Sequence, residues 1–286
     1  MVYLKQFNFP NEIDEHRIMS NLDPRRPRNS TYPLGLFSSK DFTSMVFDPI
    51  TIIYGGNGSG KTTLLNIVSS KIGALRKNRV NLGVYFEDYV ALTKFEMSFE
   101  RPLEIKFISS DDVFDNILDI KAINAGINRN KEFLVREYIE NKYNFKETDI
   151  TNYESVKAQI EPRNKTATQF VRDRLLNESI LEHSNGESAL MYWEQEIKEN
   201  SIYILDEPEN SLSAANQIKL ARFIEDSSRF YNCQFIISTH SPFLLALSEH
   251  IYDLDTIPVA THKWSDLENM RLYYDFFKQH ENEFVD

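Results

Sequence analysis

The stretch Gly55–Thr62, which reads GGNGSGKT, constrains the possible folds of this chain more than any other part of it. It matches the phosphate-binding pattern of a glycine, four residues of any type, and then Gly-Lys followed by Ser or Thr. Residues 50–54 before it are apolar and β-branched, as in a buried strand, and residues 63–68 after it place apolar side chains at helical spacing. A strand, this loop and a helix in that order predict an α/β fold and a loop that binds phosphate, rather than a glycine-rich turn that binds nothing.

The residue types of this loop suit a polyphosphate with a magnesium ion. Glycines allow consecutive backbone N–H groups to point at the phosphates, and the helix that begins near Gly60 directs its positive end toward the same anion. Lys61 is expected to reach the β- and γ-phosphates, and the Thr62 hydroxyl to ligate Mg²⁺. The residues expected to bind the ligand are Gly55, Gly56, Asn57, Gly58, Ser59, Gly60, Lys61, Thr62 and Thr63.

The composition limits the classes of protein to which the chain can belong. Its 286 residues, 41% of them hydrophobic, allow one large α/β domain or a core with an inserted lid. A net charge of −11 argues against a surface that is basic throughout, although a local basic groove for nucleic acid is compatible with it. The basic run at residues 25–28 favours a solvated loop over a binding patch. Cys233 has no cysteine partner, which fits a reducing compartment.

Two further absences predict a cytoplasmic protein without membrane insertion. The first residues lack the apolar core of a signal peptide, and acidic residues follow at once. No apolar run approaches the ~20 residues that a membrane-spanning helix needs. We therefore expect a soluble cytoplasmic protein.

The N-terminal part predicts a small antiparallel lobe in front of the phosphate loop. Residues 2–9 and 42–47 are strand-like, whereas prolines make residues 10–40 irregular. Aromatic residues of this lobe either stack on a nucleotide base or pack in the core. The candidates are Tyr32, Phe37 and Phe42.

The middle of the chain predicts a helical lid. Strands are expected at 82–86 and 103–109, and residues 113–182 carry apolar residues at helical spacing among charges of both signs. A helix is then expected to begin at Ser184, with Glu187 completing a capping box. The pattern predicts two more helices and a last strand, at 210–226, 266–283 and 251–254.

Acidic residues and a histidine follow two strongly apolar strands in the second half. Residues 202–206 end in Asp206 and Glu207, and residues 234–238 are followed by His240. An acid at a strand end opposite a phosphate loop can hold Mg²⁺, and the next acid can act as general base toward water. A solvated turn and a structural histidine are the alternatives. Because strand ends in such sheets converge on one crevice, we expect these side chains to face the γ-phosphate.

In these residues the chain resembles the ATP-binding-cassette (ABC) ATPase superfamily, from about Ile50 to Leu254. The run DEPENSLS and the run STHSPFL are similar to its soluble, non-transporter branch. That branch includes stand-alone ATPases and the heads of chromosome-maintenance and DNA-repair ATPases. Five motifs carry the resemblance, in the order of the family: Walker A (Gly55–Thr62), a signature (Ser184–Glu187), Walker B (Ile202–Pro208), a D-loop (Ser211–Ser213) and a switch histidine (His240).

The chain also departs from the family pattern. Asn185 replaces the first glycine of the transporter signature, and Ser213 replaces the usual D-loop aspartate. No glutamine occurs between Thr62 and Gln159, so the usual Q-loop residue is missing. Asp111 or Asp112 stands near that place and either contacts Mg²⁺ or caps a helix; Asp111 is taken as the candidate metal ligand.

The resemblance implies an α/β P-loop NTPase of the ABC-ATPase type. The expected domain spans residues 1–286, with a mixed sheet core, an N-terminal antiparallel lobe and a helical lid. Residues 1–112 would hold the lobe and the Walker A core, 113–182 the lid, and 183–286 the signature, Walker B and switch-histidine core. The implied ligands are ATP and Mg²⁺, and the implied catalytic residues are Lys61, Glu207 and His240.

The resemblance also implies a head-to-tail homodimer that closes on two ATP molecules. Ser184, Gly186 and Glu187 of one copy would complete the site on the phosphate loop of the other. Hydrolysis would drive a process on DNA or on a partner effector protein, in repair, genome maintenance or defence. The alternatives are the ATP-binding subunit of an ABC transporter and an ATP-gated sensor with little turnover.

Overall fold

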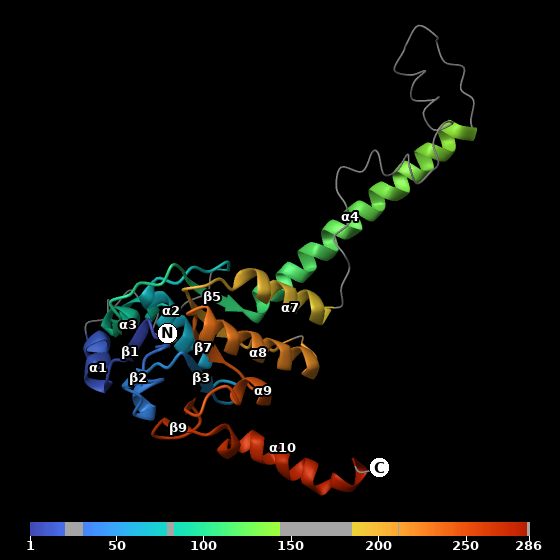
Figure 1. Cartoon of the computed structure of the whole chain (residues 1–286). Helices are drawn as coiled ribbons and strands as arrows, with labels where there is room; N and C mark the ends of the chain where they lie inside the picture. The colour runs from blue at the N-terminus through green and yellow to red at the C-terminus, as the bar shows by residue number, and fades with distance from the viewer. Residues whose placement is uncertain (21–30, 79–82, 144–184, 211, 285–286) are drawn as a thin grey trace. The chain divides into compact units, whose positions relative to one another are not determined.

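The computed structural model describes residues 1–20, 31–78, 83–143, 185–210 and 212–284 (Figure 1). The chain divides into two compact units. One comprises Met1–Phe114 together with Asn185–Asp286, and the other comprises Asp115–Ser184. All the described motif residues considered below lie in the first unit.

The first unit is built on a mixed six-stranded sheet with the order β5-β6-β7-β3-β8-β9. The first five strands run parallel, and β9 pairs antiparallel with β8. The central strands β6 and β7 are buried at every position, which explains their continuous apolar sequence. The strands are β3 (Ile50–Tyr54), β5 (Ile105–Ser109), β6 (Ile202–Asp206), β7 (Gln234–Ser238), β8 (Ile251–Asp253) and β9 (Ala260–His262).

A second, antiparallel sheet has the order β2-β1-β4, with β1 (Leu4–Asn8) in the centre. Its other strands are β2 (Ser44–Val46) and β4 (Lys94–Met97). The buried side chain of Gln234 joins this sheet to β7, because its Oε1 accepts the N–H groups of Tyr3 and Leu4 at 2.9 and 2.8 Å. The predicted α/β class with a mixed core sheet and an antiparallel N-terminal lobe is thereby confirmed.

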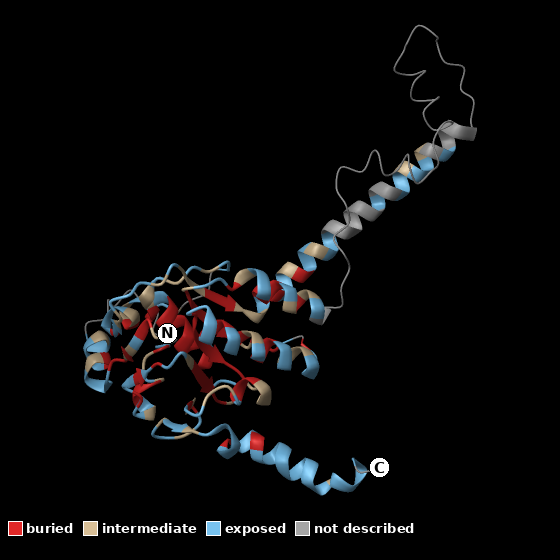
Figure 2. Ribbon diagram, in the orientation of Figure 1, coloured by how far each residue is buried: buried red, intermediate tan, exposed pale blue. Residues whose placement is uncertain are grey.

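The helices that pack on the six-stranded sheet bury apolar side chains against it (Figure 2). Helix α2 (Lys61–Ile72) places Leu64, Leu65 and Val68 in the core, and α8 (Ala214–Phe230) buries Leu220 and Ile224. The Ser213 hydroxyl caps α8 by accepting the N–H of Asn216. The remaining helices are α1 (Glu12–Ser20), α3 (Phe86–Leu92), α7 (Asn185–Glu196), α9 (Pro242–Leu245) and α10 (Glu268–Gln279).

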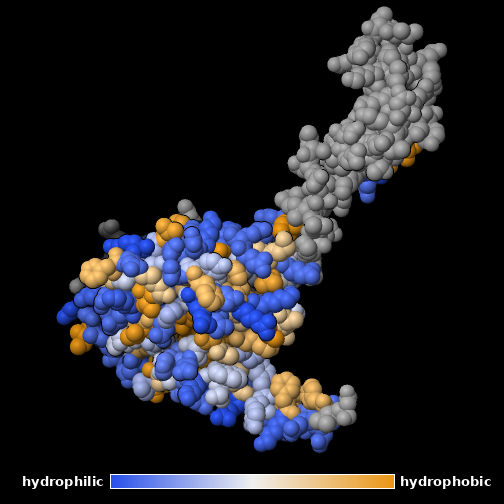
Figure 3. All heavy atoms as spheres, in the orientation of Figure 1, coloured by the Kyte–Doolittle hydropathy of each residue, from blue (hydrophilic) through white to orange (hydrophobic). Residues whose placement is uncertain are grey.

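Helix α10 is anchored at its beginning and exposed beyond it. Leu267 and Met270 pack with Tyr54 and Leu245 in a small buried cluster. The later aromatic side chains are exposed, and Figure 3 shows hydrophobic surface on this helix. They are Tyr273, Tyr274, Phe276 and Phe277.

Several sequence predictions were wrong in detail. Residues 83–86 belong to no strand, and Phe86 is instead the first residue of helix α3. The buried side chains of Phe86 and Tyr89 anchor this helix in the core. Residues 12–20 form α1 instead of irregular chain, and β4 and β9 were missed because each is only three or four residues long. Helix α4 (Ser110–Tyr143) begins three residues before the predicted lid, and residues 144–182 of that prediction lie outside the described residues.

The described helices include none that is both long and apolar enough to cross a bilayer.

Candidate nucleotide-binding site

The loop between β3 and α2 has the backbone conformation that its glycines permit. Gly55, Gly58 and Gly60 have φ angles of 155°, 82° and 106°. A Cβ atom on Gly55 would lie 2.5 Å from Ser59 Oγ, so the loop closes on itself too tightly for a side chain there. The loop is therefore shaped by its own sequence.

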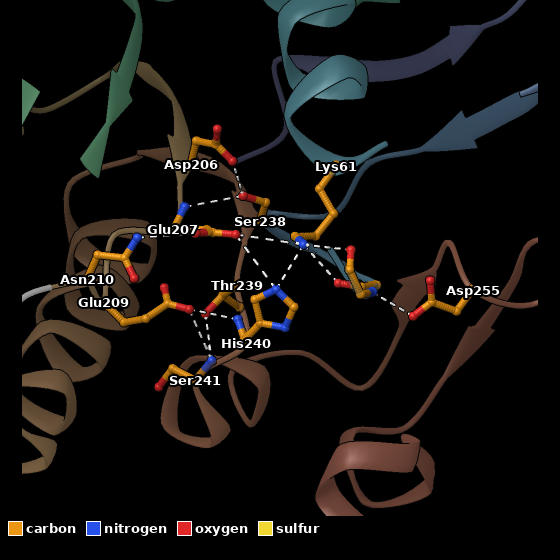
Figure 4. A network of polar contacts seen from close by, with 12 residues as sticks. Lys61, Asp206, Glu207, Glu209, Asn210, Ser238, Thr239, His240, Ser241 and Asp255 are labelled. Carbon is orange, nitrogen blue, oxygen red and sulfur yellow. Dashed lines mark hydrogen bonds and ion pairs between the residues drawn. The ribbon is translucent and has the colours of Figure 1, made fainter. Parts of the chain in front are cut away.

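Lys61 is buried at the start of α2, with 5% of its surface exposed. Its ammonium donates to the carbonyl of Gly55 at 2.8 Å and lies 2.8 Å from His240 Nε2 (Figure 4). Glu207 Oε1 lies 3.7 Å from both Lys61 Nζ and His240 Nε2. The three residues predicted to be catalytic are thus within direct reach of one another.

Asp206 ends β6 and is buried next to the loop. Ser238 Oγ donates to Asp206 Oδ1 at 2.5 Å across the parallel pair β6–β7. Burial raises the pKa of Asp206, while hydrogen bonds from Ser238 and Thr62 oppose that rise. In the described part of the chain no cluster of three His, Cys, Asp or Glu side chains could hold a metal. Asp206 and Thr62 suit Mg²⁺, which takes few protein ligands and completes its shell with water and phosphate.

Glu207 has a left-handed backbone, with φ of 49°, which is uncommon for a residue other than glycine. Its N–H donates to the carbonyl of Ser238 at 3.0 Å, and its Oε2 accepts from Asn210 Nδ2 at 3.1 Å. These contacts hold the strained turn and direct the carboxylate toward the phosphate loop. About a third of the side chain remains exposed, at 31%, so water can reach it.

His240 follows β7 and carries a ring that is half-buried. Burial and, secondly, the charge of Lys61 lower the pKa of this imidazole, whereas Glu207 and Asp255 oppose them. The neutral ring therefore predominates at neutral pH, because the ordinary pKa of histidine already lies below 7. Tyr54 contacts the ring edge-on, with the ring centroids 6.0 Å apart.

Sequence reasoning missed Glu209, which holds the segment that carries His240. Its side chain is buried, and its Oε1 accepts the N–H groups of His240 and Ser241 at 2.7 and 3.2 Å. The sequence offered one signal, a third acid three positions after Asp206.

The sequence analysis also missed two residues that hold the phosphate loop on the side away from Glu209. Asp255 Oδ2 accepts the N–H of Gly56 at 2.6 Å. Lys40 Nζ donates to the carbonyls of Ser59 and Leu254 at 2.7 and 2.6 Å, and so ties the loop to the turn after β8. Asp255 and Gly56 are about 200 positions apart in the sequence. The local sequence pattern gives no signal for a contact over such a separation.

A pocket of about 320 Å³ lies over the loop. Tyr32 lines it and hydrogen-bonds to Thr63, whereas Phe37 and Phe42 are buried in an aromatic cluster with Phe9. Of the three aromatic candidates for base stacking, Tyr32 is therefore the one placed at the pocket. The other lining residues are Leu36, Gly56, Asn57, Gly58, Gly60, Lys61, Thr62 and Glu207.

The remaining predicted residues lie away from this pocket or outside the described chain. Asp111 is exposed in the first turn of α4, and the adjacent Asp112 is buried and accepts the N–H and hydroxyl of Ser109 at 2.8 and 2.9 Å, as in a capping box. Gly186 and Glu187 lie in the first turn of α7. Ser184 and Ser211 fall outside the described residues.

Comparison with known families gives a match over more than half of the chain. The sequence profile of the family described as "AAA domain, putative AbiEii toxin, Type IV TA system" matches residues 73–246. The matched range contains Asp206, Glu207, Glu209 and His240, and it begins after the phosphate loop.

The individual proteins that match this chain share little sequence identity with it. The Campylobacter jejuni protein named "Tungstate uptake system ATP-binding protein TupC" is 22% identical over 249 residues, which span 80% of this chain and 65% of that protein. The Smc head domain of Pyrococcus furiosus has a TM-score of 0.42 and 13% identity, covering 96% of this chain and all of that one. A nucleotide-free ATP-binding cassette from an ABC transporter has a TM-score of 0.42 and 14% identity, covering 96% and 99% of the two chains.

Proposed function

Because the chain belongs to this family of AAA-domain ATPases, we propose that it binds Mg-ATP on the loop Gly55–Thr62 and hydrolyses the γ-phosphate. The convergence of Lys61, Glu207 and His240 within 2.8–3.7 Å at the mouth of the loop carries this proposal. A glycine-rich turn that binds no phosphate would not need a buried lysine beside a carboxylate and an imidazole.

Each residue has a role that follows from its position. The N–H groups of the loop and Lys61 bind the phosphates and neutralise their charge. Thr62 and Asp206 would hold Mg²⁺, which would supply positive charge to stabilise the phosphates. Glu207, which is accessible to water, orients and deprotonates the attacking water. The imidazole of His240 would contact the γ-phosphate and sense its presence.

The proposal extends to a head-to-tail homodimer. Helix α7 begins at Asn185, so Gly186 and Glu187 lie in its first turn, and a helix N-terminus is a ready site for a phosphate. The Ser184 hydroxyl and the main-chain N–H groups of Gly186 and Glu187 of one copy would bind the γ-phosphate on the other copy's loop. ATP would then close the dimer, and hydrolysis would open it.

The process coupled to hydrolysis is proposed from the family description, which refers to an AbiEii toxin of a type IV toxin–antitoxin system. On that ground we favour an ATPase that acts on nucleic acid or on a partner effector in defence, with repair and genome maintenance as related roles. The ATP-binding subunit of a transporter is the second candidate, supported by the similarity to the tungstate uptake protein. Co-fractionation with membranes in cell extracts separates the two: a transporter subunit sediments with the membranes.

Phosphate release from ATP by the purified chain tests the proposal. We expect hydrolysis that needs Mg²⁺ and stops with EDTA, measured with and without duplex DNA. Sedimentation with a non-hydrolysable ATP analogue and Mg²⁺ is expected to show a dimer. Tight ATP binding without turnover would identify an ATP-gated sensor, and a chain that binds no ATP would overturn the assignment.

A further inference from the structure

The buried carboxylate of Glu209 links the two loops that carry Glu207 and His240. Glu209 lies two residues after Glu207, in the loop that follows β6. Its Oε1 accepts from the main chain of His240 at 2.7 Å and of Ser241 at 3.2 Å, in the loop that follows β7 (Figure 4). The contact therefore crosses from one strand end to the next.

Placing this carboxylate here is costly for folding. The residue is 91% buried, and its Oε2 has no hydrogen-bond partner among the described residues. Burial raises the pKa of Glu209, and hydrogen bonds from His240 and Thr239 oppose that rise. Burying a carboxylate is unfavourable unless its hydrogen bonds compensate, so the two main-chain donors of the loop after β7 are what stabilise Glu209 in this place.

The contact bears directly on the position of the imidazole. The nitrogen of His240 is two covalent bonds from its Cβ, so holding this N–H restricts where the Cβ, from which the imidazole projects, can lie. Ser241 has an additional tie, because its hydroxyl donates to Gln217 Oε1 of α8 at 2.8 Å. Loss of Glu209 would therefore release His240 more than it releases Ser241.

We propose that Glu209 is a positioning residue for hydrolysis: its carboxylate holds the main chain of His240 so that the imidazole stays beside Lys61 and Glu207. The inference rests on the proposed ATPase function and deepens it. According to this inference, the Glu209 side chain makes the position of His240 depend on the loop that follows β6.

The chain offers a matched control in Glu15. This residue is also buried, at 5% exposed, and its Oε2 accepts the N–H of Gly35 and the hydroxyl of Ser38 at 2.7 and 2.8 Å. Its Oε1 likewise has no hydrogen-bond partner among the described residues. Glu15 thus has the same chemistry as Glu209, but it supports the segment around Leu36, which lines the pocket wall.

The test compares Glu209→Ala, Glu209→Gln and Glu15→Ala with the unaltered chain. Glu209→Ala is expected to lower kcat about tenfold and leave the ATP Kd within about twofold, because it removes two main-chain hydrogen bonds that act only on the loop carrying His240. Glu209→Gln keeps a carbonyl oxygen for both N–H groups and is expected to restore most of the rate. Glu15→Ala is expected to weaken ATP binding instead. Equal loss of kcat in Glu15→Ala and Glu209→Ala would overturn the proposal.

A double-mutant cycle with His240→Ala gives the second readout. If Glu209 acts through His240, Glu209→Ala lowers kcat less than twofold when His240 is already alanine. A tenfold loss in both backgrounds would show a role independent of the histidine. If Glu209→Ala does not fold, as judged by thermal unfolding, Glu209→Asp replaces it in the cycle.

A third readout does not need hydrolysis. In ¹³C-histidine NMR spectra, the ring signal of His240 is assigned by its loss in His240→Ala. Glu209→Ala is expected to shift that signal, because the ring moves relative to Tyr54, whereas Glu15→Ala leaves it in place. An unmoved signal with normal hydrolysis by the parent chain would refute this inference alone; absence of hydrolysis by the parent chain would refute the proposed function.

Discussion

The two sides of the nucleotide pocket are built in different ways. On one side, Gly55–Thr62 is a single continuous loop whose shape follows from its own glycines. On the other side, Asp206, Glu207 and His240 come from the ends of two neighbouring strands, and their positions depend on the register of β6 against β7. We infer that the loop side supplies affinity for phosphate and the strand-end side supplies turnover.

Gly55→Ala is expected to weaken ATP binding by changing the shape of the loop while leaving the strand-end residues in place. A methyl group would meet Ser59 Oγ at 2.5 Å, at a φ that side chains rarely adopt, so the loop must open. Strain of about 1–3 kcal/mol predicts ATP binding weaker by roughly fivefold to 150-fold. Isothermal titration calorimetry with ATP and Mg²⁺ measures it.

The control for this change is Gly73→Ala at the end of α2. Gly73 also has a positive φ, of 73°, but an added Cβ would meet nothing within 4 Å. We expect this variant to lose about 1 kcal/mol of stability and to keep its ATP affinity. If both variants bound ATP as the parent chain does, the shape of the loop would not determine affinity.

The sequence could predict the phosphate-contacting residues of the loop side, since all of them lie within eight consecutive positions. On the strand-end side it predicted the buried strands and the order of Asp206, Glu207 and His240, because apolar runs and acids at their ends are local signals. It could not predict Glu209, Asp255 or Lys40, whose contacts join distant segments through the packing of the sheet. It also mistook the start of α3 for a strand, because aromatic residues suit both.

Lys40→Met is expected to have a smaller effect, on the loop side only. Lys40 donates to the carbonyls of Ser59 and Leu254, and burial lowers the pKa of Lys40 while Asp255 and Asp253 oppose that shift. The side chain is partly exposed, so we expect a loss of about 1 kcal/mol, or roughly fivefold in ATP affinity, with kcat unchanged.

Lys5→Met is the control for Lys40→Met. Lys5 is exposed, with Glu96 at 3.8 Å, and such a surface pair contributes little. A fall in kcat at unchanged affinity in Lys40→Met would contradict the division between the two sides.

The most direct test of this division measures ATP affinity and turnover in Lys61→Ala and Glu207→Gln side by side. Lys61→Ala removes the buried cation of the loop and is expected to abolish tight ATP binding. Glu207→Gln keeps the shape of the side chain but loses the base, so it is expected to bind ATP as the parent chain does and to hydrolyse it about 10²–10⁴-fold more slowly. Equal loss of affinity in both variants, or turnover by Glu207→Gln at the parent rate, would contradict the account.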